Sequence, residues 1–236
     1  MLYSLRFFLF ALLLLSLIGC SEDNPDTPTF SREFIFSEPT GWIVDFADYP
    51  PGDTSIFTFE SVFTTLPEPL DTNLSALRIS GANRSGDLFM YTKRQLTGLP
   101  ANTSFLVRVE AILASDAPSN AVGIGGPPGE SVYLKTGVTQ EEPTTGLDDQ
   151  GWLRLNIDKG NQSMLGADAL SLGNAANGTD DFTYVRLTRS TADALTFTTD
   201  DLGRAWFYIG SDSGFEGTTT LYYHRVKLDL TALNNE

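Results

Sequence analysis

Apolar and polar residues alternate with a period of two along much of this chain. Between residues 105 and 113 the odd-numbered positions are apolar, whereas Arg108 and Glu110 stand among the even-numbered ones. The same alternation runs through residues 221–230 and through the phenylalanine-rich residues 57–63. Because successive side chains of a β-strand point to opposite faces, this period predicts half-buried strands.

Shorter apolar runs between Gly, Asn and Pro residues predict further strands. Helical periodicity is nearly absent, and only residues 168–172 and 190–195 could form single helical turns. The pattern predicts an all-β, antiparallel β-sandwich of jelly-roll type with roughly ten to thirteen strands, more than an immunoglobulin-type sandwich holds. The additional strands are expected at residues 76–80, 88–96, 131–138, 153–157, 184–187, 195–198 and 205–209.

The alternation also predicts the core. The side chains expected on buried faces are Phe105, Val107, Val109, Val226 and Leu228. The only histidine, His224, falls in phase with Val226, so the pattern places it on the apolar face as a core residue rather than as a catalytic base.

One stretch carries a family resemblance. Residues 96–111, LTGLPANTSFLVRVEA, resemble the late strands of fibronectin type III domains. They also resemble a sequence segment found in galactose-binding-like jelly rolls, which include many carbohydrate-binding modules. More than a hundred residues follow, which favours the jelly roll. The resemblance covers about residues 57–230 and implies a ligand-binding sandwich. Such modules commonly carry an acidic calcium-binding pair after the tyrosine of the closing strand, whereas here His224 and Arg225 follow Tyr223.

The first twenty residues follow a different pattern. Arg6 is their only charge, and residues 7–18 are apolar except for Ser16. A run of this length is well short of the roughly 20 residues that span a bilayer as a helix. A charged start, an apolar centre and small residues at the end form the layout of a secretory signal peptide.

This segment ends in Leu-Ile-Gly-Cys, which resembles the lipobox of bacterial lipoprotein precursors. In that family the cysteine is acylated and the chain is cut before it. The resemblance implies a signal peptide over residues 1–19, a lipidated Cys20 and the lipid bilayer as partner. Ser21 after the cysteine implies the outer membrane if the organism is Gram-negative. Residues 20–29 are predicted to form a flexible tether, and residues 30–236 a single domain.

Composition excludes several functions. The formal net charge of −15 argues against a nucleic-acid partner. One cysteine permits no disulfide within the chain, and one histidine is too few for the usual zinc sites. Asp212, Ser213 and Gly214 resemble a hydrolase motif, but a serine triad needs a histidine as base. No catalytic residue and no cofactor are therefore predicted.

Three polar, glycine-rich stretches remain as candidate binding loops: residues 123–137, 156–162 and 210–217. We expect them to converge at one end of the sandwich beside an aromatic side chain, which suits a neutral glycan. The candidate ligand-binding residues are Glu130, Tyr133, Lys135, Asp158, Lys159, Asn161, Gln162, Asp212 and Glu216.

Several alternatives stay open. The same side chains could simply hold long loops together. The domain could instead bind an envelope protein through a sheet face, or, more remotely, use loop carboxylates as a glycoside hydrolase. Asp45 and Asp48, in an expected turn region, are weak candidates for structural calcium, although aspartates are also common turn formers.

Overall fold

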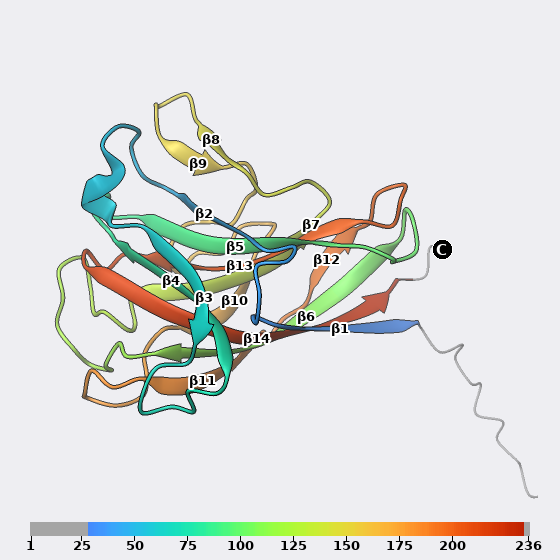
Figure 1. The fold of residues 1–236 in the computed structure, drawn as a ribbon. Coiled ribbons are helices and arrows are strands. Elements are labelled where there is room, and N and C mark those ends of the chain that lie inside the picture. The colour runs from blue at the N-terminus through green and yellow to red at the C-terminus, as the bar shows by residue number, and fades with distance from the viewer. Residues whose placement is uncertain (1–27, 234–236) are drawn as a thin grey trace, which may run out of the picture.

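The computed structural model describes residues 28–233, so the signal peptide, Cys20 and most of the predicted tether lie outside the described residues. The described chain forms fourteen strands and one short 3₁₀ turn, and every strand pair is antiparallel (Figure 1). The prediction of an all-β antiparallel sandwich is confirmed. Within residues 28–233, no helix has the length and apolar character needed to cross a membrane.

The strands form two large sheets that face each other across the core. Strands β4, β5, β6 and β7 pass alternately from one sheet to the other, which is the connectivity of a jelly roll. The seven-stranded sheet has the order β11 (Val185–Ser190), β6 (Ser104–Ser115), β14 (Thr218–Ala232), β4 (Ser75–Ala82) and β3 (Glu60–Thr65), with β1 (Thr29–Ile35) on β14 and β12 (Leu195–Thr198) on β6. The five-stranded sheet has the order β10 (Leu170–Asn174), β7 (Val132–Thr139), β13 (Ala205–Ser213), β5 (Leu88–Leu96) and β2 (Ile43–Ala47).

The core between the sheets contains the residues that the alternation predicted. Phe105, Val107, Val109, Val226 and Leu228 are all fully or almost fully buried, which confirms this part of the prediction. The ring of Phe105 packs on Phe197 of β12 and Phe30 of β1, at centroid distances of 5.5 and 5.7 Å. A single residue of β6 thus ties two edge strands to the core.

A β-bulge in β14 overturns the prediction for His224. The register of β14 against β6 shifts between Tyr223 and Arg225. Residues before this shift therefore point to the opposite face of the sheet from the one that the alternation predicted. Tyr223 is buried, whereas Tyr222 and His224 are only half-buried. The ring nitrogen Nδ1 of His224 lies 2.7 Å from the Ser75 carbonyl oxygen.

Some predicted elements differ in type. Residues 54–57 form the 3₁₀ turn η1 (Thr54–Phe57), and the strand expected from Phe57 begins only at Glu60. Asp53 accepts a hydrogen bond from the Ser55 amide and thereby caps this turn. No helical turn forms at residues 168–172, because the strand β10 begins at Leu170, and the loop expected at residues 140–151 contains the short strand β8 (Thr145–Leu147).

Four candidate positions lie on strands rather than in loops. Lys135 and Tyr133 belong to β7, Asp212 to β13, and Asp45 to β2. For the first three, glycines caused the error, because Gly137 and Gly210 suggested turns. Both lie inside strands, where a Cβ atom would overlap the Asp168 and Met90 carbonyl oxygens respectively.

Residues 140–169, hereafter the covering segment, lie across the outer face of the five-stranded sheet. They include the hairpin strands β8 (Thr145–Leu147) and β9 (Leu153–Leu155), which project beside β2 and β5 in Figure 1. Leu155 and Ile157 pack on a buried cluster of Ala47, Phe89, Tyr91 and Tyr208. This sheet face is therefore a second small core and not an open surface.

The chain enters and leaves at one end of the sandwich, where Thr29 pairs with Thr231. The opposite end, hereafter the far end, holds the connections after β4, β6 and β13 and the one before β11. Figure 1 shows this separation, with β1 and the last part of β14 together on one side.

Candidate functional site

Charged side chains lie beneath the covering segment on the outer face of the five-stranded sheet. Leu134 of β7 and Ser211 of β13 point away from that face, so the strand period turns their neighbours Lys135 and Asp212 towards it. Both side chains are almost completely buried. Asp48 follows β2, and its backbone amide donates to the Leu153 carbonyl oxygen of the covering segment.

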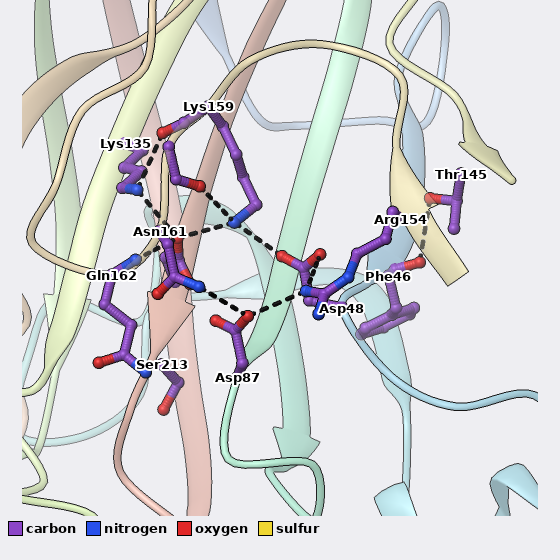
Figure 2. Close-up of polar contacts among 12 residues, drawn as sticks. Phe46, Asp48, Asp87, Lys135, Thr145, Arg154, Lys159, Asn161, Gln162 and Ser213 are labelled. Carbon is purple, nitrogen blue, oxygen red and sulfur yellow. Dashed lines mark hydrogen bonds and ion pairs between the residues drawn. The ribbon is translucent and has the colours of Figure 1, made fainter. Parts of the chain in front are cut away.

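Lys159 of the covering segment joins these groups. Its Nζ lies 2.7 Å from Asp48 Oδ2 and 2.8 Å from Asp212 Oδ2, and it also donates to the Gly160 carbonyl oxygen (Figure 2). Lys135 Nζ lies 2.9 Å from Asp212 Oδ2 and donates to the carbonyl oxygens of Lys159 and Met164. Each ammonium group therefore has three acceptors, which is its full capacity.

A second part of the network lies closer to solvent. Arg154 Nη1 lies 2.8 Å from Asp48 Oδ1 and 3.0 Å from Asp87 Oδ2. Asn161 Nδ2 donates to the same Asp87 oxygen at 3.2 Å, as Figure 2 shows. Three carboxylates and three cationic side chains thus neutralise one another, and the cationic partners of all three acids come partly from the covering segment.

Burial and neighbouring charges shift the ionisation of these groups in different directions. Burial alone would raise the pKa of Asp212, but the Lys159 and Lys135 ammonium groups hold that pKa below its usual value. Burial lowers the pKa of Lys135, whereas the Asp212 and Asp48 carboxylates overcome burial and raise the pKa of Lys159. Burial, together with the Asp212 and Asp48 charges, raises the pKa of Asp87 to about 6.

The three carboxylates do not form a fitting cation site. Oxygens of Asp48, Asp87 and Asp212 lie within 4.8 Å of one another, which suggests a metal centre at first sight. The Lys159 ammonium stands between Asp48 and Asp212, at the place where a calcium ion would need open oxygen ligands. Asp45 is not in this group, because its carboxylate accepts from the Tyr91 hydroxyl and the Phe46 amide.

The structure brings several predicted site residues together. Asp212 is the meeting point of four predicted residues. Its Oδ2 pairs with Lys135 and Lys159 and also accepts from the backbone amide of Gln162. Asn161 joins them through Asp87. The polar groups of these residues bond mainly to one another and to the backbone. Such bonding gives them a structural role, and their ligand-binding role stays a prediction.

Other predicted residues lie apart from this network. Asp158 is exposed and accepts from the Gly160 and Ala167 amides. Glu130 accepts from the Asn120 amide in its own loop, and Glu216 is exposed at the far end. Tyr133 is half-buried on β7.

Sequence reasoning missed Asp87 and Arg154 and assigned Asp48 to a different role. Asp87 follows a turn glycine, and Arg154 stands in a short alternating run, so neither has a distinctive local pattern. Their meeting depends on how the covering segment folds back over β2 and β5. Asp48 and Arg154, which bond to each other, are 106 residues apart, so no local charge pattern could have paired them.

The margin of the covering segment forms a cleft of about 290 Å³ against β7 and β12, hereafter the β7–β12 cleft. Most of its lining side chains are hydroxyls, amides and carboxylates. The lining residues are Val138, Thr139, Gln140, Glu141, Asn156, Ile157, Asp168, Thr196, Phe197 and Thr198. None of these residues, all in the described part of the chain, carries a positive charge.

Local contacts fix the walls of this cleft. Thr139 Oγ1 donates to the Glu141 carbonyl oxygen, and Gln140 Nε2 donates to the Thr199 carbonyl oxygen. Asp168 accepts from the Asp158 amide, while its own carbonyl oxygen accepts from the Tyr208 hydroxyl. The backbone around Gln140 and Asp168 is thus positioned by bonds to the sandwich, while Glu141, Thr196 and Thr198 are exposed.

Comparison with known proteins finds no matching family model and no matching curated protein. Similar solved structures include a TmCBM61 module in complex with β-1,4-galactotriose, at 11% identity and a TM-score of 0.36, covering 81% of this chain and 90% of that one. A cyclase from Fischerella sp. TAU has 14% identity and a TM-score of 0.37, with coverage of 86% and 90%.

The enzymatically active domain of tailspike protein 4 from bacteriophage CBA120 has 10% identity and a TM-score of 0.36. The match covers 84% of this chain but only 20% of the tailspike chain. These three proteins include both a binding module and enzymes, and their TM-scores are low. A functional conclusion has to come from the residues of this chain.

Proposed function

We propose that this protein is an exported, lipid-anchored and non-catalytic binding protein whose β-sandwich holds a neutral glycan in the β7–β12 cleft. The observation that supports this proposal is the lining of the cleft, which combines hydroxyl, amide and carboxylate groups with no cationic side chain. The proposed lipid anchor rests on the lipobox-like sequence before Cys20.

The lining fits sugar hydroxyls by hydrogen-bonding capacity. Glu141 and Asp168 carboxylates accept hydrogen bonds, whereas the Thr196 and Thr198 hydroxyls can both donate and accept. Ile157 and Phe197 supply apolar contact for the carbon face of a sugar ring. Two carboxylates would repel an anionic ligand, so phosphorylated or acidic sugars are disfavoured. The volume is near the lower end for ligand pockets, which suits a short stretch of a glycan.

A binding role is favoured over glycoside hydrolysis by the state of the candidate acids. Asp212 is fully buried and paired with two lysines, so it cannot approach a glycosidic bond. The Asp158 carboxylate is occupied by two backbone amides, and its pKa is lowered by them. Neither group has the raised pKa and open position of a general acid.

A glycan array followed by calorimetry on the described domain tests the proposal. We expect neutral oligosaccharides to bind with micromolar to millimolar affinity. Glu141→Gln and Thr196→Val should each weaken the affinity about tenfold, because the first replaces a charged acceptor by a weaker neutral one and the second removes a hydroxyl, each at a cost of about 1–1.5 kcal/mol. Both side chains are exposed, so the melting temperature should not change.

Asp149→Asn is the matched control, since it neutralises an exposed carboxylate outside the cleft in the same covering segment. Its affinity should equal that of the wild type. The proposal fails if no neutral glycan binds, or if Glu141→Gln and Asp149→Asn have the same affinity. Co-purification of one stoichiometric protein without glycan binding would favour an envelope-protein partner instead.

A further inference from the structure

A second, smaller pocket lies at the far end of the sandwich and shares no lining residue with the β7–β12 cleft. Its volume is about 110 Å³, and we call it the far-end pocket. Residues from four segments line it: Ser115, Asp116, Ala117, Pro128, Phe182, Phe215, Thr218, Thr219 and Thr220. Strands β6 and β14 form its floor, and the loops of the far end form its rim.

The rim is apolar and partly exposed. Phe182 leaves 74% of its surface in solvent, although it directly borders the pocket. Phe215 is held in place by the neighbouring loop, because Gly123 lies so close that a Cβ atom there would overlap the Phe215 ring. Val122 and Ile124 flank this glycine with 99% and 73% of their surfaces exposed. Exposed apolar side chains gathered around a pocket are typical of interaction sites.

The floor is polar and incompletely satisfied. Ser115 and Thr219 are buried. The Ser115 hydroxyl accepts from the Ala117 amide, whereas the buried Thr219 hydroxyl has no hydrogen-bond partner among residues 28–233. That hydroxyl has almost no accessible surface, and its strand partner Gly81 faces the core side chains Leu88 and Met90, so it closes the bottom of the pocket and is not open to a ligand.

Asp116 gives the pocket its charge. Its carboxylate is half-buried at the end of β6, and this burial raises the pKa of Asp116. None of the residues lining the pocket is cationic, and Asp180 and Asp181 precede Phe182 in the rim. A cation that entered would be attracted by the carboxylate and could also approach the rings of Phe182 and Phe215.

We propose that the far-end pocket binds an alkylammonium group, such as the side chain of a lysine on a partner protein. An aliphatic stem would lie between Phe182, Phe215 and Pro128. The ammonium would donate to the Asp116 carboxylate, the one charged group in the lining of the pocket. A lysine side chain is narrow enough for this volume, whereas pockets for larger ligands are several times bigger. The surrounding exposed Val122 and Ile124 favour a protein as the source over a free amine.

The test is an NMR titration of the isotope-labelled domain with four probes: N-acetyl-lysine methylamide, N-acetyl-norleucine methylamide, which lacks the ammonium group, short lysine-containing peptides, and the free amine cadaverine. We expect saturable shifts at residues 115–117, 182 and 215–220 with the lysine probe, and at least tenfold weaker binding of the norleucine probe. Tighter binding of lysine-containing peptides than of cadaverine assigns the site to a protein, and equal binding assigns it to a free amine.

Two variants separate binding from folding. Asp116→Asn keeps the shape of the side chain and should weaken the affinity for the lysine probe about tenfold. Thr219→Val removes a buried, unpartnered hydroxyl that the ligand does not touch, so it should bind the lysine probe like the wild type and be at least as stable. Asp149→Asn, on the remote hairpin, should bind like the wild type. Equal binding of the norleucine and lysine probes, or shifts that do not saturate, would overturn the proposal.

Discussion

Asp87 is the carboxylate that the buried network satisfies least completely. Its Oδ2 accepts from Arg154 and Asn161, but its Oδ1 is buried without a partner among the described residues. Burial and two neighbouring carboxylates raise its pKa to about 6, above the usual value of about 3.9. The folded state therefore holds this proton more tightly than the unfolded state does.

The sign of the resulting pH dependence follows from linkage. Between about pH 4 and about pH 6 the folded state binds more protons at Asp87 than the unfolded state, so stability falls as the pH rises. Asp87→Asn removes this loss. We expect the free energy of unfolding of the variant, minus that of the wild type, to increase across this window and to level off above it. Urea denaturation at a series of pH values measures this difference, and a constant difference would contradict the assignment.

At the scale of elements, the position of the covering segment depends on ion pairs between side chains as much as on apolar contact. Leu155 and Ile157 pack on the sheet, but the rest of the covering segment is largely exposed and has only two short strands. Lys159 connects it to Asp48 beside β2 and to Asp212 on β13. We infer that this lysine fixes the position of the covering segment, and with it the wall of the β7–β12 cleft.

Lys159→Ala tests this role. It leaves two buried carboxylates without their shared cation, and such a change costs about 3–5 kcal/mol of unfolding free energy. Hydrogen exchange should also show faster exchange in residues 153–169. Lys227→Ala is the control, because Lys227 forms an exposed pair with Asp229 at 2.9 Å and should contribute little. If Lys159→Ala instead leaves stability intact and abolishes ligand binding, the network itself is the ligand site.

At the scale of the whole molecule, the two ends of the sandwich differ in what they offer. The chain enters at the end where β1 pairs with the last part of β14, so the proposed anchor is attached there. The apolar rim of the far-end pocket lies at the opposite end. An anchored protein of this shape would hold the far end away from its attachment point, where a partner could reach it.

The proposed anchor is tested by Cys20→Ser in the full chain. Without the thiol no acyl chain can be attached, so the variant should remain as uncleaved precursor or appear as a soluble species. Detergent phase partitioning and the mass of the amino terminus measure this outcome. The lipoprotein proposal is wrong if the variant enters the detergent phase like the wild type after loss of residues 1–19.

The alternation of apolar and polar residues determined the sheet-forming segments and much of the core. An alternation with a period of two shows which face of a strand is buried, and it does so without reference to the neighbouring strands. Residues 105–113 illustrate this, since Phe105, Val107 and Val109 are buried as predicted. The same reasoning failed at His224, because a bulge depends on the register between β14 and β6 and not on either strand alone.

The candidate sites were decided mainly by tertiary structure. The sequence indicated that Lys135, Lys159 and Asp212 lie in polar stretches, but their pairing depends on a segment of thirty residues that folds across the sheet. Asp48 and Asp212 are far apart in the chain, and only this arrangement places Lys159 between them. Ion pairs and clefts form between elements, so their composition follows from packing, whereas the alternation that builds each strand is already complete within it.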